Sequence, residues 1–295
     1  MKTLYLHIGR GKTGTTAQQA YLGRNRDALL AAGIDYLLAG DRGRGVGHQE
    51  FAKSFITDPP GTMIPARDPA GIRAETAAEI RASTAPALLL SSENFPLADL
   101  DALADWIAAL GVELQVRVIF LVRSQDELAE SEYNQMVKLM RETRSPAAYA
   151  DALEGADYAA ECAAWAARFG AENIQARVYD GAAGDAVARF LDCLPARDLP
   201  APEDTAQDAG YANRSIGARA LLAARLLNGI EIEARQPLYR KLFAGFAAAG
   251  DLPAVLLSAA QARALRDRYA ESNARFARAY LDPAHPACRT GDLGG

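Results

Sequence analysis

Residues 4–22 read LYLHIGRGKTGTTAQQAYL, and this stretch decides the fold that we expect. Residues 3–8 alternate in the manner of a β-strand, and the glycines and threonines of residues 10–16 predict a tight turn. Apolar side chains then recur at helical spacing over residues 15–32, and Gly33 ends the pattern. These residues therefore predict a strand, a turn and a helix, the repeating unit of an α/β fold.

The rest of the chain continues this alternation. We expect further strands at 33–38, 85–92, 114–123 and 174–180, and helices at 68–83, 98–110, 125–140, 147–169 and 184–193. Residues 39–69 form a long loop, and a proline-bearing linker (194–212) precedes three more helices at 214–228, 235–249 and 258–281. This order predicts an α/β fold of three layers, with helices on both faces of a central, mostly parallel sheet.

All of these elements are expected to form one domain, residues 1–295. Residues 1–195 would be its α/β cofactor-binding core, and residues 213–282 a helical C-terminal part. The last segment, 283–295, predicts a flexible tail because it is short, terminal and rich in Pro and Gly.

Composition limits the class of ligand. A formal net charge of −5 argues against a nucleic-acid-binding protein, which needs a basic surface, but leaves room for a small anion. The three cysteines are widely spaced, as in a reduced cytosolic chain, and form no metal-type cluster. We find neither a signal peptide nor a run near the ~20 apolar residues of a membrane span. We therefore expect a cytoplasmic protein without a membrane span.

The turn after the first strand has the chemistry of an anion site. It leads into a helix N-terminus, where free N–H groups and the helix dipole favour negative charge. Glycines allow close approach of the backbone, threonines offer hydroxyl groups, and Lys12 adds a positive charge. We expect the loop to bind a phosphate or a sulfate ester. The predicted binding residues are Arg10, Gly11, Lys12, Thr13, Gly14, Thr15 and Thr16.

The loop does not match the usual loop of proteins that bind nucleoside triphosphates. That loop has the order G-x-x-x-x-G-K-[ST], whereas Lys12 here precedes the last glycine. A magnesium-binding acid at a strand end is not evident either, and Asp180 is the nearest candidate. An ATP-dependent kinase-like phosphotransferase is thus an alternative, not the favoured interpretation.

A second polar motif follows the strand predicted at 114–123. Arg123 ends that strand, where the fork of a guanidinium can bind a phosphate monoester. On the next helix, Ser131, Asn134 and Lys138 share one face at spacings i, i+3 and i+7. The plainer alternative is an arginine paired with an acidic residue of the same helix, beside a solvated polar face.

Together the two motifs resemble those of sulfotransferases that use 3′-phosphoadenosine 5′-phosphosulfate (PAPS). HIGRGKTGTT is similar to the family's 5′-phosphosulfate loop, and VIFLVRSQDELAESEYNQMVK carries its strand-ending Arg, with Ser eight positions later. The resemblance covers residues 1–195, and ESEYNQMVK and NRSIGARALLAARLLNG look like bacterial members with unassigned acceptors. It implies a P-loop-type fold, a 3′-phosphate held by Arg123 and Ser131, and PAPS as sulfuryl donor without a metal.

Sulfuryl transfer also needs a base for the proton of the acceptor. Glu93 ends the strand at 85–92, in the place where cytosolic members carry a catalytic His; the Lys-x-His motif of those members is absent here. His48, in the long loop, is the second candidate for the base. Glu93 could instead cap a helix or pair with an arginine, and His48 could be an ordinary surface residue. Asn213 and Arg214, just after the linker, could close over the donor.

The hypothesis from the sequence is therefore a PAPS-dependent sulfotransferase. Lys12 would stabilise charge on the leaving oxygen, and Glu93 or His48 would take the proton. The acceptor is open among carbohydrates, lipid headgroups and small metabolites, and the oligomeric state is open too. A non-catalytic nucleotide-binding protein is the second alternative.

Overall fold

Five strands form one sheet, all parallel, in the order β2-β3-β1-β4-β5. The structure, a computed structural model, describes residues 1–40, 47–60, 63–139, 142–179, 183–196, 199–201, 215–232 and 235–294. The strands are β1 (Lys2–His7), β2 (Ile34–Tyr36), β3 (Ala87–Ser91), β4 (Leu114–Val122) and β5 (Ile174–Val178). The parallel sheet confirms the predicted strands, whose near-continuous apolar runs are typical of strands buried on both faces.

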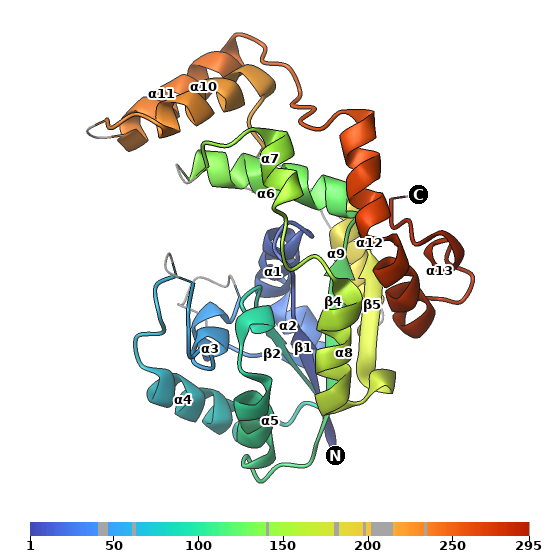
Figure 1. Cartoon of the computed structure of the whole chain (residues 1–295). Helices are drawn as coiled ribbons and strands as arrows, with labels where there is room; N and C mark the ends of the chain where they lie inside the picture. Colours follow the sequence, from blue (N-terminus) through green and yellow to red (C-terminus); the bar gives the residue numbers. More distant parts are fainter. Residues whose placement is uncertain are drawn as a thin grey trace.

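Helices cover both faces of the sheet, which makes three layers (Figure 1). One face carries α1 (Thr15–Arg24), α2 (Arg26–Ala31) and α9 (Ala183–Leu191). The other face carries α4 (Pro69–Ala82), α5 (Leu100–Ala108), α8 (Tyr158–Phe169) and α12 (Ala259–Tyr280). The predicted α/β fold of three layers is therefore confirmed, because right-handed crossovers place successive helices on the two faces in this way.

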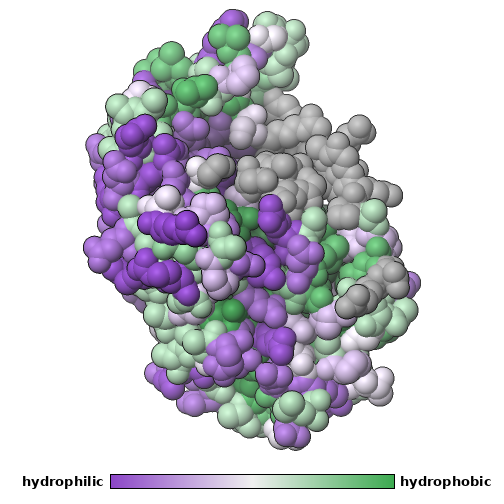
Figure 2. Space-filling view, turned by 90° about the vertical axis from the view of Figure 1, so that its right-hand side faces the viewer, coloured by the Kyte–Doolittle hydropathy of each residue, from purple (hydrophilic) through white to green (hydrophobic). Residues whose placement is uncertain are grey.

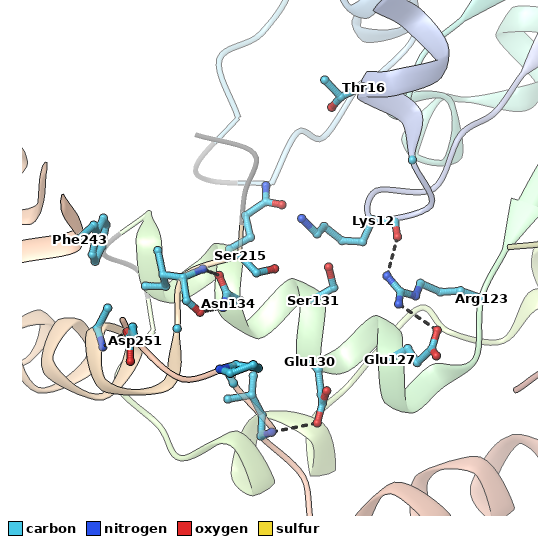
Figure 3. Close-up of a pocket in the computed structure, with 18 of the residues that line it drawn as sticks. Lys12, Thr16, Arg123, Glu127, Glu130, Ser131, Asn134, Ser215, Phe243 and Asp251 are labelled. Carbon is cyan, nitrogen blue, oxygen red and sulfur yellow. Dashed lines mark hydrogen bonds and ion pairs between the residues drawn. The ribbon is translucent and has the colours of Figure 1, made fainter. Parts of the chain in front are cut away.

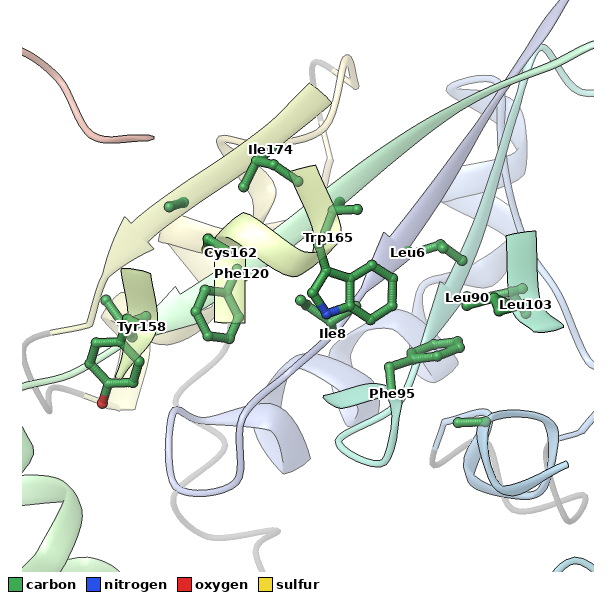
Figure 4. Close-up of a cluster of buried hydrophobic side chains, with 14 of the residues drawn as sticks. Leu6, Ile8, Leu90, Phe95, Leu103, Phe120, Tyr158, Cys162, Trp165 and Ile174 are labelled. Atoms are coloured by element: carbon green, nitrogen blue, oxygen red, sulfur yellow. The ribbon is translucent and has the colours of Figure 1, made fainter. Parts of the chain in front are cut away.

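The larger core lies on the α8 side of the sheet. Trp165 of α8 is 2% exposed and packs against Phe95, whose ring centre lies 6.4 Å away. Figure 4 shows these two rings beside Leu6 of β1, Leu90 of β3 and Ile8, the residue that directly follows β1. This aromatic layer fixes the positions of the central strand ends.

A separate group of helices stands beyond the carboxyl edge of the sheet. It consists of α6 (Gln125–Lys138), α7 (Pro146–Asp151), α10 (Ala218–Asn228) and α11 (Arg235–Ala248), which lie together at the top of Figure 1. Tyr133 and Val137 of α6 share a small core with Leu221 of α10 and Tyr239 and Phe243 of α11. The short elements of the chain are α3 (Gln49–Lys53), η1 (Phe95–Leu97), η2 (Ala171–Asn173) and α13 (Ala287–Thr290).

Several predicted boundaries differ from the structure. The helix expected at 15–32 is interrupted at Asn25, and the one expected at 147–169 is two helices, α7 and α8, separated by a turn with Gly155 at φ 66°. The helical C-terminal part is also divided between two cores. Helix α12 packs on the sheet layer, whereas α10 and α11 pack on α6.

The segment 283–295, predicted as a flexible tail, contacts the core through two of its described residues. Ala287 of α13 and Leu293 are 0% and 5% exposed and belong to the larger core. The prediction missed this because two apolar residues between prolines and glycines give no periodic signal.

The outer surface is mixed. On the face in Figure 2, hydrophilic residues alternate with small hydrophobic groups. Of the helices in the described part of the chain, none is both long enough and apolar enough to cross a membrane.

The packed C-terminal segment gives a test of the fold. Replacing Leu293 with Ala should lower the free energy of unfolding by about 2 kcal/mol, because it leaves a cavity in the core. Leu30→Ala, at a residue that is 53% exposed, should change it by less than about 0.5 kcal/mol. Urea denaturation measures both, and equal effects would contradict the packed segment.

Candidate functional site

The loop after β1 lies in the middle of the sheet's carboxyl edge. β1 has β3 on one side and β4 on the other. After β1 the chain turns onto the α1 face, whereas after β4 it returns to the sheet through α8 on the opposite face. Neighbouring strands whose connections diverge in this way leave a crevice, where open α/β sheets bind ligands.

The loop backbone is held in an unusual conformation. Lys12 has φ 70° and is the one non-glycine residue with positive φ in the described part of the chain. Gly14 has φ 81°, and a Cβ there would lie 2.3 Å from Cβ of Ala186. Backbone strain of this kind at Lys12 is typical of functional loops.

Helix α1 starts directly behind this loop without a side-chain cap. Its N-cap is Gly14, no described side chain accepts from its first N–H groups, and its first turn has no acidic residue. The N–H groups and the dipole of α1 are therefore available to an anion.

An open pocket of about 1100 Å³ extends from this helix terminus. Its walls come from the loop and α1, the ends of β3, β4 and β5, helix α6, and the segments around α10 and α11. At the loop end the lining residues are Lys12, Gly14, Thr15, Thr16, Ala17, Glu93, Arg123, Glu127, Ser131 and Tyr179.

Lys12, Arg123 and Ser131 point toward the same space (Figure 3). One terminal nitrogen of Arg123 donates to the carbonyl oxygen of Lys12 at 3.0 Å, and the other donates to Glu127 at 2.9 Å. Its guanidinium also lies over the ring of Tyr179, 5.4 Å from the centre. Its Nε atom is buried without a partner among the described residues.

The cations Lys12 and Arg123 lie close together at this end of the pocket, beside the carboxylates of Glu93 and Glu127. Burial lowers the pKa of Lys12, and the charge of Arg123 lowers it further, while Glu93 and Glu132 act in the opposite direction. Burial and the charge of Lys12 lower the pKa of Lys138 to about 8. Cations that destabilise one another in this way favour a bound anion.

Glu93 lies opposite Lys12 in the pocket wall. Its carboxylate accepts a hydrogen bond of 3.2 Å from the hydroxyl of Thr15, the first residue of α1. The side chain is exposed. Thr15 thus holds a solvent-accessible carboxylate at the helix terminus that would bind the anion.

His48 is not placed to act as the base in this structure. The side chain is 0% exposed and does not line the pocket. Its Nδ1 accepts from the backbone N–H of Ser91 at 3.0 Å, and its Nε2 lies 2.7 Å from the carbonyl oxygen of Leu37. Both ring nitrogens therefore bond to the backbone at the ends of strands β2 and β3. The one lone pair of the ring is used there and is not available to take a proton from an acceptor substrate.

Three predicted loop residues do not line the pocket. The guanidinium of Arg10 binds the carbonyl oxygen of Gly155 and the carboxylate of Glu161, so it holds the loop to α8 and to the segment before it. The hydroxyl of Thr13 is buried and donates to the carbonyl oxygen of Arg10 at 2.7 Å. A Cβ at Gly11 would meet nothing within 4 Å, so packing does not require glycine there.

Two acidic residues near the loop, Glu161 and Glu132, were not among the predicted site residues. Burial raises the pKa of Glu161 to about 6 against the opposing charge of Arg10, and burial also raises the pKa of Glu132. No sequence motif indicated either residue, because their burial depends on helices that are distant in the chain. Tyr179 could have been found, since it follows β5 at the same sheet edge as Arg123.

The remaining residues named from the sequence are Asn134, Asp180, Asn213 and Arg214. Asn134 is buried, and its side chain binds both the N–H and the carbonyl oxygen of Ile216, so it serves structure. Asp180, Asn213 and Arg214 lie outside the described residues. Among the residues that are described, no three His, Cys, Asp or Glu side chains gather closely enough to hold a metal ion.

Comparison with family models, with curated proteins and with solved structures gives no match to this chain.

Two substitutions at Lys12 measure the backbone strain there, because Lys12→Gly and Lys12→Ala both remove the charge but differ in the cost of positive φ. Lys12→Gly should have a free energy of unfolding about 1 kcal/mol above that of Lys12→Ala, because glycine adopts positive φ without cost. At Lys241, in the helix α11, the order should reverse, by about 1 kcal/mol in favour of Ala. Urea denaturation compares the pairs, and the same order at both positions would contradict the strain at Lys12.

Glu161 should make stability depend on pH. The pKa of Glu161 in the folded protein is about 6, above its ordinary value of 4.5. The contribution of this group to the free energy of unfolding is therefore fully present below pH 4.5 and is lost as the pH rises through 6. Glu161→Gln should therefore gain about 2 kcal/mol relative to the wild type between pH 4.5 and 7. Denaturation at several pH values measures this difference, and a difference that does not vary with pH would contradict it.

Proposed function

We propose that this chain is a PAPS-dependent sulfotransferase with a P-loop-type fold. The observation that carries the proposal is the convergence of Lys12, Arg123 and Ser131 on one pocket, at a helix N-terminus without a cap. Both motifs that resemble the sulfotransferase family thus contribute to the same site. A strand, a glycine-bearing loop and a helix in the centre of a parallel sheet support the P-loop type of fold.

The residues present fit the two anionic ends of the donor. The N-terminus of α1, Lys12 and the hydroxyl of Thr16 would bind the 5′-phosphosulfate, while the hydroxyl of Thr15 stays on Glu93. Arg123 and Ser131 would bind the 3′-phosphate, which gives the buried Nε of Arg123 an acceptor. Arg123 would exchange Glu127 for this phosphate at low cost, since Glu127 is 43% exposed and such pairs are weak.

The chemistry needs a base, a nucleophile and a stabilised leaving group. Glu93 would take the proton of the acceptor's hydroxyl or amine group as its oxygen or nitrogen forms a bond to sulfur. The bond from sulfur to the 5′-phosphate oxygen breaks, and adenosine 3′,5′-bisphosphate leaves. Lys12 and the N–H groups of α1 would stabilise the charge that develops on this oxygen.

A thermal-shift comparison of nucleotides tests the proposal. Adenosine 3′,5′-bisphosphate should stabilise the protein more than adenosine 5′-monophosphate or ATP with Mg²⁺. Arg123→Ala should weaken bisphosphate binding by about tenfold or more and remove its advantage over the monophosphate. Arg275→Ala, at an exposed ion pair on α12, is the matched control and should leave both unchanged.

Other outcomes would favour the alternatives. Stabilisation by ATP with Mg²⁺ alone, lost in EDTA, would overturn the proposal in favour of a kinase-like phosphotransferase. Bisphosphate binding without any transfer from PAPS to alcohols, in both the wild type and Glu93→Gln, would favour a nucleotide-binding protein without catalysis.

A further inference from the structure

The pocket continues well beyond the residues assigned to the donor. Its volume of about 1100 Å³ is at or above the upper end of the ~300–1,000 Å³ usual for a single ligand. In Figure 3, Arg123 and Glu127 lie at one end, Phe243 and Asp251 lie at the other, and Ser131 and Asn134 lie between them. The pocket thus has room for a second molecule next to the donor.

The far end has apolar walls. They come from the residues before α10, from α10 and α11, and from the segment that leads to α12. The apolar lining residues are Ile216, Ala220, Phe243, Ala247, Leu252, Pro253, Ala254 and Leu256. Leu252 is 56% exposed, so the apolar wall continues to the protein surface.

Two carboxylates of this region accept hydrogen bonds from backbone N–H groups. Asp251 accepts from the N–H groups of Arg219, Ala220 and Leu252. Glu130 accepts from the N–H groups of Leu256 and Leu257 at 3.0 and 2.9 Å.

The same holds for Asn134, whose side chain is occupied by the backbone of Ile216. Among the described lining residues of this region, the polar side chains outside this network are Ser215 and Gln135, and both are exposed. A carbohydrate here would find few side-chain partners for its hydroxyl groups, and burying a hydroxyl without a partner is costly, whereas an apolar body needs no such partners.

We propose that this far end binds the acceptor, and that the acceptor is an alcohol or phenol with an apolar body. The inference rests on the proposed function, because the hydroxyl group would lie near Glu93 and Lys12. Glu93 takes its proton, the hydroxyl oxygen bonds to sulfur, and the bond from sulfur to the 5′-phosphate oxygen breaks. The apolar body lies between α10, α11 and residues 252–256.

Direct binding of model alcohols tests this assignment. Calorimetric titrations would use 2-naphthol, 1-octanol and methyl β-D-glucopyranoside, each with and without adenosine 3′,5′-bisphosphate. We expect 2-naphthol or octanol to bind and the glucoside not to bind. The aromatic and the aliphatic probe distinguish a ring-shaped body from a chain-shaped one.

A pair of variants locates the site. Ala247→Glu places a carboxylate in the apolar wall and should weaken alcohol binding by about tenfold or more, since the charge would be desolvated. Ala248→Glu adds the same charge at the next residue of α11, which is also exposed but does not line the pocket. This control should bind the alcohol like the wild type.

The outcomes separate this proposal from the proposed function. Binding of the glucoside in place of the alcohols, or equal binding by both variants, would overturn the assignment even if the bisphosphate binds. Alcohol binding that Ala247→Glu abolishes, in a protein that does not bind the bisphosphate, would support the apolar site and overturn the sulfotransferase.

Discussion

The contacts of Arg123 join four segments of the chain at the loop end of the candidate site. One nitrogen of its guanidinium holds the carbonyl oxygen of Lys12, and another holds Glu127 on α6. Its own carbonyl oxygen accepts from the hydroxyl of Tyr158 at 2.8 Å, and its guanidinium lies over Tyr179. The ends of β4 and β5, the loop after β1 and helix α6 thus meet at one planar cation, and α8 meets the backbone of the same residue.

Helix α6 connects the two halves of the pocket. Its Ser131 faces the loop end, while Glu130 and Asn134 hold the backbone at residues 256–257 and 216. Asn228 of α10 donates to the carbonyl oxygen of Val137, near the end of α6. Helix α6 therefore contacts both the loop end and the segments that form the apolar wall.

Most of the fold could be predicted from the sequence, and part of the site could. Hydrophobic period and turn residues indicated the five strands and most helices, and the rule for parallel sheets brought Lys12, Glu93, Arg123 and Ser131 to one edge. The packed residue Leu293 could not be predicted, since its burial depends on distant contacts, and the break at Asn25 rests on local hydrogen bonds to Tyr21 that give no periodic signal. The burial of His48 could not be predicted either, because a loop sequence does not reveal that Leu37 and Ser91 contact both ring nitrogens.

By itself, the sequence determined the elements and the two polar motifs, because periodicity, glycine content and helix N-termini are local properties of a chain. Only the tertiary structure decided which members of those motifs line the pocket. Arg10 and Thr13 belong to the loop as much as Lys12 does, yet Glu161 and a loop carbonyl occupy them. It also decided the apolar far end, because the carboxylates and amide there are polar in the sequence but are engaged by backbone groups of remote segments.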